Sequence, residues 1–186
     1  MSRLWRVFPW DPGAESGNRG HPLWIPRTLQ GAGRHDNPDL YGAMYLSERP
    51  LAAMTEQIAH LRGQRLDDTD LERGGTRLAL VPLDGPLEGR LWDLDDPRVL
   101  VERRLRPSQV ATRVRELTRR QAADLFRARP RRDGLRWWSA LEASWIHVTL
   151  FDRAVARLSL LAAPEPLHST HSVVREAAEA LGISLR

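Results

Sequence analysis

The stretch GAGRHDNPDLYGAMYLSERPLAAMTEQ, residues 31–57, predicts a loop, a strand and a helix in immediate succession. Gly, Asn, Asp and Pro dominate its first part, which is the composition of a turning loop. The run AMYLS at 43–47 is short and mostly apolar, which favours a buried strand. Pro50 suits the first turn of a helix. We expect this helix to be entered through Ser47 and to end near Leu61.

Apolar residues recur along this helix at helical spacing and mark its inward face: they are Leu51, Met54, Ile58 and Leu61. Glu56 lies well off this stripe. Periodicity alone therefore places Glu56 in solvent, and the residue acquires a function only if its side of the helix borders a cleft.

Working outward, strands are expected at 4–10, 76–83, 88–96, 135–139 and 145–151. The longest helix should span 108–128, with Val110, Val114, Leu117 and Leu125 inward. A short helix is expected within 96–105, and a capped one over 172–181, stopped by Gly182. The segment 155–161 fits either element. Strands lead, helices interrupt, and no βαβ rhythm appears, so we predict one compact α+β domain over 1–186 with a mixed sheet and flanking helices.

The composition bounds the class of protein. The chain has 186 residues, of which 41% are hydrophobic and 28% charged, as in a globular domain. No apolar run has the length of a membrane span, and the N-terminus lacks the apolar core of a signal peptide. Cysteine is absent, which rules out disulfides and thiolate metal sites. We expect a cytoplasmic protein without a membrane partner.

All 28 basic residues are arginine, and the net charge is +4. The missing lysine has two readings: codon bias in a GC-rich genome, or a functional preference for arginine forks, which suit phosphate. So small a net charge, with 24 acids interspersed, does not indicate direct nucleic-acid binding. The densest basic run, RARPRRDGLR at 127–136, is typical of a solvated helix end and loop, but an acidic partner chain could use it.

Motifs for metals and nucleotides are missing. His168 and His171 lie near each other, but no third ligand has matching spacing, so no metal site is expected. The GAG at 31–33 is a fragment of a dinucleotide fingerprint in the wrong context, because a loop and a strand follow it. No nucleophile elbow occurs.

Three other residues have two readings each. Arg34, in an open glycine-flanked loop, could grip a diphosphate by two parallel hydrogen bonds, or lie on the surface and pair with Asp36 or Asp39. Tyr45 could stack on a base or nicotinamide, or be a core tyrosine. Ser139 could act in a site, or be a sheet hydroxyl satisfied by the backbone.

Three segments in this order resemble the RES-domain toxins of RES–Xre toxin–antitoxin systems: LWRVFPWDP at 4–12, the opening stretch, and GLRWWSALEASWIHVTLFDRA at 134–154. The family is named for an arginine, a glutamate and a serine. The resemblance covers roughly residues 4–154, and its most specific part is the middle segment. His35 departs from the family, in which many members have tryptophan or another aromatic residue.

The resemblance implies an ADP-ribosyltransferase-like fold and an enzyme that degrades NAD, with NAD as substrate and no cofactor. It assigns Arg34, Glu56 and Ser139 to catalysis, and Arg6, Arg34 and Tyr45 to substrate binding. Arg34 and Arg6 would hold the diphosphate, Tyr45 would stack on the nicotinamide side, Ser139 would orient the ribose or the nicotinamide amide, and Glu56 would stabilise positive charge on the ribose.

The expected function is therefore an NAD glycohydrolase or phosphorylase that acts as a toxin and is neutralised by a cognate Xre-type antitoxin. Water, phosphate and a protein side chain all stay open as acceptors. Two alternatives also stay open: an ADP-ribosyltransferase that modifies a protein, and a non-catalytic binding module, which predicts no NAD turnover.

Overall fold

The computed structural model describes residues 3–186, so the first two residues of the predicted domain lie outside the described residues. The expected α+β class, with a mixed sheet and flanking helices, is confirmed. Contacts within the chain group it into two compact units. The first unit comprises Ile25–Leu46 and Gly85–Leu158, and the second comprises Arg3–Trp24, Ser47–Asp84 and Ser159–Arg186.

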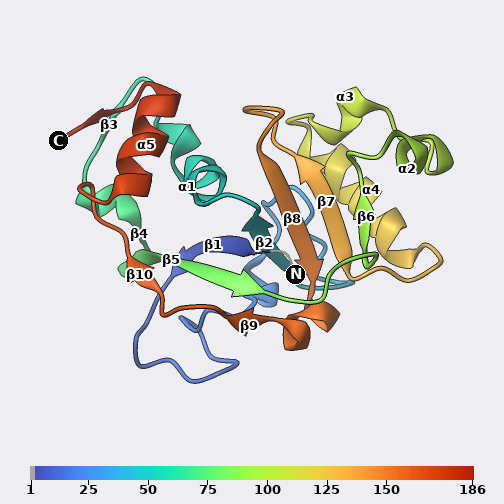
Figure 1. Ribbon diagram of the computed structural model, residues 1–186, viewed down its shortest axis with the longest axis horizontal. Helices are drawn as coiled ribbons and strands as arrows, with labels where there is room; N and C mark the ends of the chain where they lie inside the picture. Colours follow the sequence, from blue (N-terminus) through green and yellow to red (C-terminus); the bar gives the residue numbers. More distant parts are fainter. Residues whose placement is uncertain (1–2) are drawn as a thin grey trace. The chain divides into compact units, whose positions relative to one another are not determined.

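Strands of the first unit follow the order β2-β8-β7-β6 (Figure 1). Their bounds are Ala43–Ser47, Ile146–Phe151, Gly134–Trp138 and Leu91–Asp93. β7 runs antiparallel to β8 and parallel to β6, so the sheet is mixed. The helices of this unit are α2 (Pro97–Glu102), α3 (Pro107–Val110) and α4 (Arg115–Arg127), with short 3-10 turns at Arg27–Leu29 and Asp152–Arg157.

The second unit is built around β5 (Thr76–Asp84), which pairs antiparallel with β1 (Leu4–Pro9) along its length. Three two-residue strands also pair antiparallel with β5: β4 (Glu72–Arg73), β9 (Ser159–Leu160) and β10 (Glu165–Pro166). β3 (Arg65–Leu66) and β11 (Ser184–Leu185) form a separate parallel pair. Two 3-10 turns, Ala59–Leu61 and Asp68–Leu71, flank β3.

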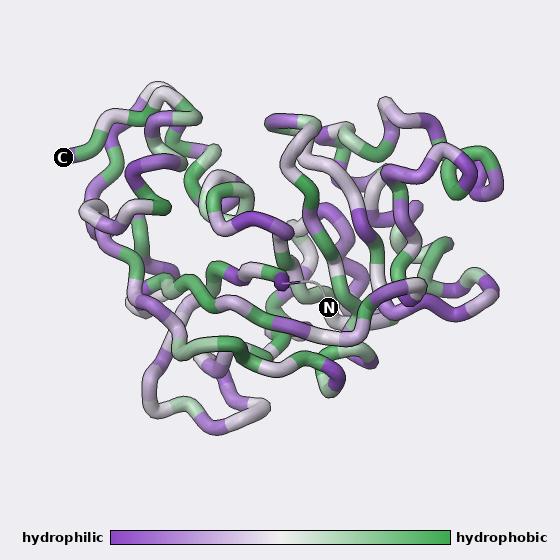
Figure 2. Tube along the Cα trace, in the orientation of Figure 1, coloured by the Kyte–Doolittle hydropathy of each residue, from purple (hydrophilic) through white to green (hydrophobic). Residues whose placement is uncertain are grey.

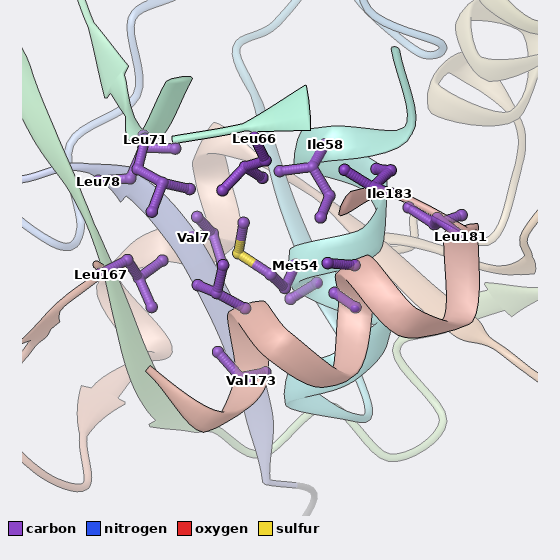
Figure 3. Close-up of a cluster of buried hydrophobic side chains, with 14 of the residues drawn as sticks. Val7, Met54, Ile58, Leu66, Leu71, Leu78, Leu167, Val173, Leu181 and Ile183 are labelled. Atoms are coloured by element: carbon purple, nitrogen blue, oxygen red, sulfur yellow. The ribbon is translucent and has the colours of Figure 1, made fainter. Parts of the chain in front are cut away.

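α1 (Pro50–Ile58) and α5 (Ser172–Leu181) enclose the core of the second unit with β1 and β5. Figure 3 shows Met54 and Ile58 from α1 and Val173 and Leu181 from α5 within one cluster of buried side chains. The predicted end of α5 is confirmed, because Gly182 adopts a left-handed conformation (φ 66°) that stops the helix.

Two details of α1 differ from the sequence prediction. Its N-cap is Arg49, while Ser47 is the last residue of β2. Its buried face is wider than the predicted stripe. Met54, Ile58 and Leu61 are buried as predicted. Ala52 and Thr55 are fully buried as well, while Leu51 is only half-buried. Small Ala and Thr side chains allow a close approach to the neighbouring elements, which apolar periodicity alone does not register.

The predicted helix over 108–128 is also wrong in its first half. The chain forms α3, leaves the helical path at residues 111–114, and resumes as α4. Val114 was expected to point inward but is 58% exposed. The physical reason for this break lies in the environment of Arg34.

Candidate functional site

One carboxylate folds the loop before β2. Oδ2 of Asp36 accepts hydrogen bonds from the N–H groups of Gly31 (2.9 Å) and Gly33 (2.7 Å). Oδ1 accepts from the hydroxyl of Tyr45 at 2.7 Å, and the same hydroxyl oxygen accepts from the N–H of His35 at 2.9 Å. The Tyr45 hydroxyl thus ties the loop to β2 through His35 and Asp36, the two residues that follow Arg34.

Glycine is required at position 33 because the loop closes tightly there. A Cβ on Gly33 would lie 2.5 Å from Oδ1 of Asp36 and 2.6 Å from the Tyr45 oxygen, closer than real Cβ atoms approach. Burial, reinforced by the Asp36 charge, raises the pKa of the Tyr45 phenol well above its ordinary value. Tyr45 therefore stays protonated and remains a donor to Asp36.

Arg34 is held inside the first unit and is only 6% exposed, so it is not the surface arginine of the alternative reading. Its Nη1 donates to the backbone oxygens of Val110 (3.1 Å) and Thr112 (2.6 Å). Its guanidinium carbon lies 4.7 Å from the ring centroid of Trp137, a cation–π arrangement. Its own backbone oxygen accepts from the hydroxyl of Thr118 at 2.6 Å.

These contacts account for the break between α3 and α4. In a continuous helix the oxygens of Val110 and Thr112 would accept from backbone N–H groups four residues later. Here they turn toward Nη1 of Arg34, and the helix resumes only at Arg115. At these two oxygens, hydrogen bonds from the Arg34 guanidinium thus take the place of backbone helix bonds.

His35 lies among aromatic side chains, between Tyr45 and Trp137. Its ring is buried, lies edge-on to Trp137 at 5.1 Å between centroids and stacks 6.4 Å from Tyr45. Its Nδ1 lies 2.8 Å from Oγ1 of Thr149. Burial first, then the charge of Arg34, lowers the pKa of the His35 imidazole well below its ordinary value. The ring is neutral at physiological pH and serves as an aromatic surface beside Arg34.

Ser139 directly follows β7. It lies two residues after Trp137, so the two side chains share one face of the extended chain. Ser139 is 2% exposed, its N–H donates to the oxygen of Trp145 (2.8 Å), and its Oγ accepts from the N–H of Leu141 (3.0 Å). The Ser139 hydroxyl therefore has a backbone partner, as its non-catalytic reading predicted. The same strand, β7, also carries the Trp137 ring that contacts Arg34.

Arg6 and Glu56 belong to the second unit. Arg6, on β1, is 8% exposed, and its guanidinium donates to the backbone oxygens of Pro22 and, at 2.8 Å, of Trp24. Burial lowers the pKa of Arg6 to about 10, so it remains charged at neutral pH. Glu56, on α1, is exposed, as its position off the apolar stripe predicts.

The first unit thus carries Arg34, Tyr45 and Ser139 of the predicted set, and the second unit carries Arg6 and Glu56. Sequence reasoning considered Asp36 only as a surface partner of Arg34, and it missed Trp137 and Thr118; all three fix the Arg34 loop. Asp36 left a signal, since an Asp two positions after Arg34 and three after Gly33 can accept backbone N–H groups of a turn. Trp137 and Thr118 left none, because their contacts span long stretches of chain.

Among residues 3–186, no group of three or more His, Cys, Asp or Glu side chains is placed to hold a metal ion. In the same described part of the chain, no helix combines the length and apolar character needed to cross a bilayer.

Comparisons with known proteins identify the family of this chain and a solved structure with a similar fold. The family model described as RES domain matches residues 3–170 and so spans both units. Among solved structures, the chain is similar to one in the crystal structure of the MbcT–MbcA toxin–antitoxin complex of M. tuberculosis. The TM-score is 0.58 at 16% identity, over 97% of this chain and 89% of that one. No curated protein matches the sequence significantly. The structural likeness shows a shared fold.

Proposed function

Because the chain belongs to the RES domain family, we propose that it is an NAD-consuming enzyme that cleaves the bond between nicotinamide and ribose. The observation that carries the proposal is the fixed guanidinium of Arg34. Contacts with the oxygens of Val110 and Thr112 and with the ring of Trp137 fix this buried guanidinium in one orientation. An arginine that served only as a surface charge would not need to be fixed in this way. A prepositioned guanidinium is what recognition of a diphosphate requires.

In the proposed reaction, the roles follow the family resemblance, which assigns Arg34 and Arg6 to the diphosphate of NAD. Nη1 of Arg34 donates to two backbone oxygens, which holds the planar guanidinium in a fixed orientation for the diphosphate. Tyr45 contributes its ring to the nicotinamide side, and its hydroxyl holds the loop. Ser139 orients the ribose or the nicotinamide amide.

The chemical step breaks the N-glycosidic bond. Its electron pair goes to the ring nitrogen, and nicotinamide leaves as a neutral molecule from a cationic nucleoside. The ribose carbon gains positive charge in the transition state, as in glycoside cleavage. The carboxylate of Glu56 stabilises that charge, and an oxygen of water or phosphate bonds to the carbon and loses its proton. No metal or cofactor takes part in this scheme.

An enzyme that consumes NAD without restraint would harm the cell that makes it. Its activity therefore needs a neutralising partner. We propose that the protein acts as a toxin and that an Xre-type antitoxin silences it by placing an acidic end against the arginines of the site. The toxin–antitoxin nature of the similar complex supports this partner.

The decisive experiment incubates the purified chain with NAD, with and without phosphate, and identifies the products by mass spectrometry. Nicotinamide with ADP-ribose indicates hydrolysis, and nicotinamide with a phosphorylated ADP-ribose indicates phosphorolysis. Mass added to a protein in cell lysate instead identifies an ADP-ribosyltransferase. If NAD stays intact in every case, and expression of the protein alone leaves cellular NAD unchanged, the catalytic proposal fails.

A further inference from the structure

An arginine-rich surface covers one part of the first unit, apart from the residues assigned above to NAD. It combines the end of α2 and the segment after it with the loop that precedes β7, and we call it the arginine surface: Arg98, Arg103, Arg104, Arg106, Arg129, Arg131 and Arg132. The two segments are in contact, because Nη2 of Arg103 donates to the oxygen of Arg129 at 3.1 Å. Figure 2 shows the loop before β7 mostly in the purple of hydrophilic residues.

Positive charge on this surface is largely uncompensated. Of its seven arginines only Arg103 forms an ion pair within the described residues, with Glu102 at 2.6 Å. Nearby carboxylates are engaged elsewhere. Asp133 pairs with Arg90 and Arg157, and Asp93 pairs with Arg136. The surface therefore gathers seven guanidinium groups in two neighbouring segments of a chain whose net charge is only +4.

Part of the surface is prearranged by one tryptophan. The guanidinium carbons of Arg103 and Arg132 lie 4.0 Å and 5.4 Å from the ring centroid of Trp92. Nε1 of Trp92 donates to the oxygen of Leu125 at 2.9 Å, which fixes the ring against α4. Two arginines from different segments are thereby held against the same ring.

Arg104 occupies a backbone conformation that normally favours glycine. It has a φ of 54°, the one positive φ of a non-glycine residue in the described chain. The N–H of Leu105 bonds to the oxygen of Leu100 (2.8 Å), and that of Arg104 to the oxygen of Val101 (3.1 Å). This is the helix-ending motif in which glycine is usual after the C-cap.

The same chain shows the usual solution at the end of α5. There Gly182 holds the left-handed position with φ 66°, and the N–H of Ile183 bonds to the oxygen of Ala178 at 2.8 Å. An arginine in the equivalent place after α2 strains the backbone, because its Cβ crowds the following carbonyl. What it adds over glycine is a long cationic side chain on an exposed site.

We propose that the arginine surface docks an acidic protein segment that also carries apolar side chains. Charge complementarity requires an anionic partner. The apolar element is Val101, which is 79% exposed on α2, one turn after Arg98. A phosphate backbone offers no partner for that valine, whereas a protein segment with carboxylates and leucines satisfies both. Arginine is also the basic residue that protein interfaces favour.

The test uses the full chain and a labelled synthetic peptide of repeated Glu-Glu-Leu-Glu units, with fluorescence anisotropy as the readout. The neutral Gln-Gln-Leu-Gln peptide, a DNA duplex and a single-stranded RNA serve as competitors. Arg104→Gly is the key variant, because relief of strain should raise the melting temperature by roughly 2–4 °C while one binding charge is lost. Arg131→Gln removes a second charge, and Arg175→Gln on α5 is the matched control.

We expect the acidic peptide to bind, salt to weaken it, and each of Arg104→Gly and Arg131→Gln to lower its affinity by about twofold to fivefold. Arg175→Gln should leave the affinity unchanged. Three results would overturn the proposal: no binding of the acidic peptide, equal affinity of wild type and the Arg104→Gly/Arg131→Gln double variant, or stronger binding of DNA or RNA than of the peptide.

Discussion

Tyr45→Phe separates two roles that the sequence alone left undivided. The substitution keeps the aromatic ring and removes only the hydroxyl. If Tyr45 contributed nothing but a stacking ring, phenylalanine would replace it without loss. The structure instead uses the hydroxyl twice, as donor to Asp36 (2.7 Å) and as acceptor from the N–H of His35 (2.9 Å).

The expected cost follows from these two bonds. A hydrogen bond to a charged group contributes about 1.5–3 kcal/mol, and a neutral one about 0.5–1.5 kcal/mol. The Tyr45 hydroxyl is removed from water, which is why burial raises its pKa. We therefore expect Tyr45→Phe to lower the free energy of unfolding by about 2–4 kcal/mol. The Arg34 loop should loosen, and NAD turnover should fall with it.

The assay pairs urea unfolding with amide hydrogen exchange over residues 31–36 and with NAD turnover. Gly33→Ala is a second perturbation of the same contact, because its Cβ would meet Asp36 and the Tyr45 oxygen at 2.5 Å and 2.6 Å. Both variants should speed exchange in this loop. A Tyr45→Phe protein with wild-type stability and wild-type exchange would refute the role of the hydroxyl, whatever its NAD turnover. Wild-type protein without turnover would refute the catalytic proposal alone.

Three further substitutions test individual residues. Arg34→Lys keeps the charge but loses the planar fork, so NAD turnover should drop substantially; equal activity would reduce Arg34 to a point charge. Glu56→Gln, at an exposed position, should change the stability by less than about 0.5 kcal/mol, yet slow NAD cleavage by roughly 100-fold. A folded variant with normal turnover would remove Glu56 from the site. His35→Phe should flatten the acid sensitivity of stability. Burial depresses the pKa of His35, so the unfolded chain takes up a proton first, and wild type loses up to about 1.4 kcal/mol per pH unit below about pH 6.5. The measurement is the free energy of unfolding of both proteins between neutral and acidic pH. An equal fall in the two proteins as the pH is lowered would contradict this prediction.

Local pattern was sufficient for several elements. β2 is found at the predicted residues 43–47, and α5 occupies the predicted 172–181 with Gly182 as its stop. Each of these follows from neighbours in the sequence, namely apolar runs and a residue suited to a left-handed turn. The exposure of Glu56 was predictable for the same reason, since helical periodicity fixes which side of α1 faces away from its core.

Contacts between distant residues decided the rest. The pattern over 108–128 reads as one helix, but the oxygens of Val110 and Thr112 bind Arg34, which lies far away in the sequence, and the helix breaks. Likewise, nothing near Arg34 indicated that Trp137 would lie beneath it. By itself the sequence determined several elements, such as β2 and α5, and, through its ordered motifs, the RES family. Only the tertiary structure decided that Arg34 is buried and fixed, because burial depends on which segments pack together.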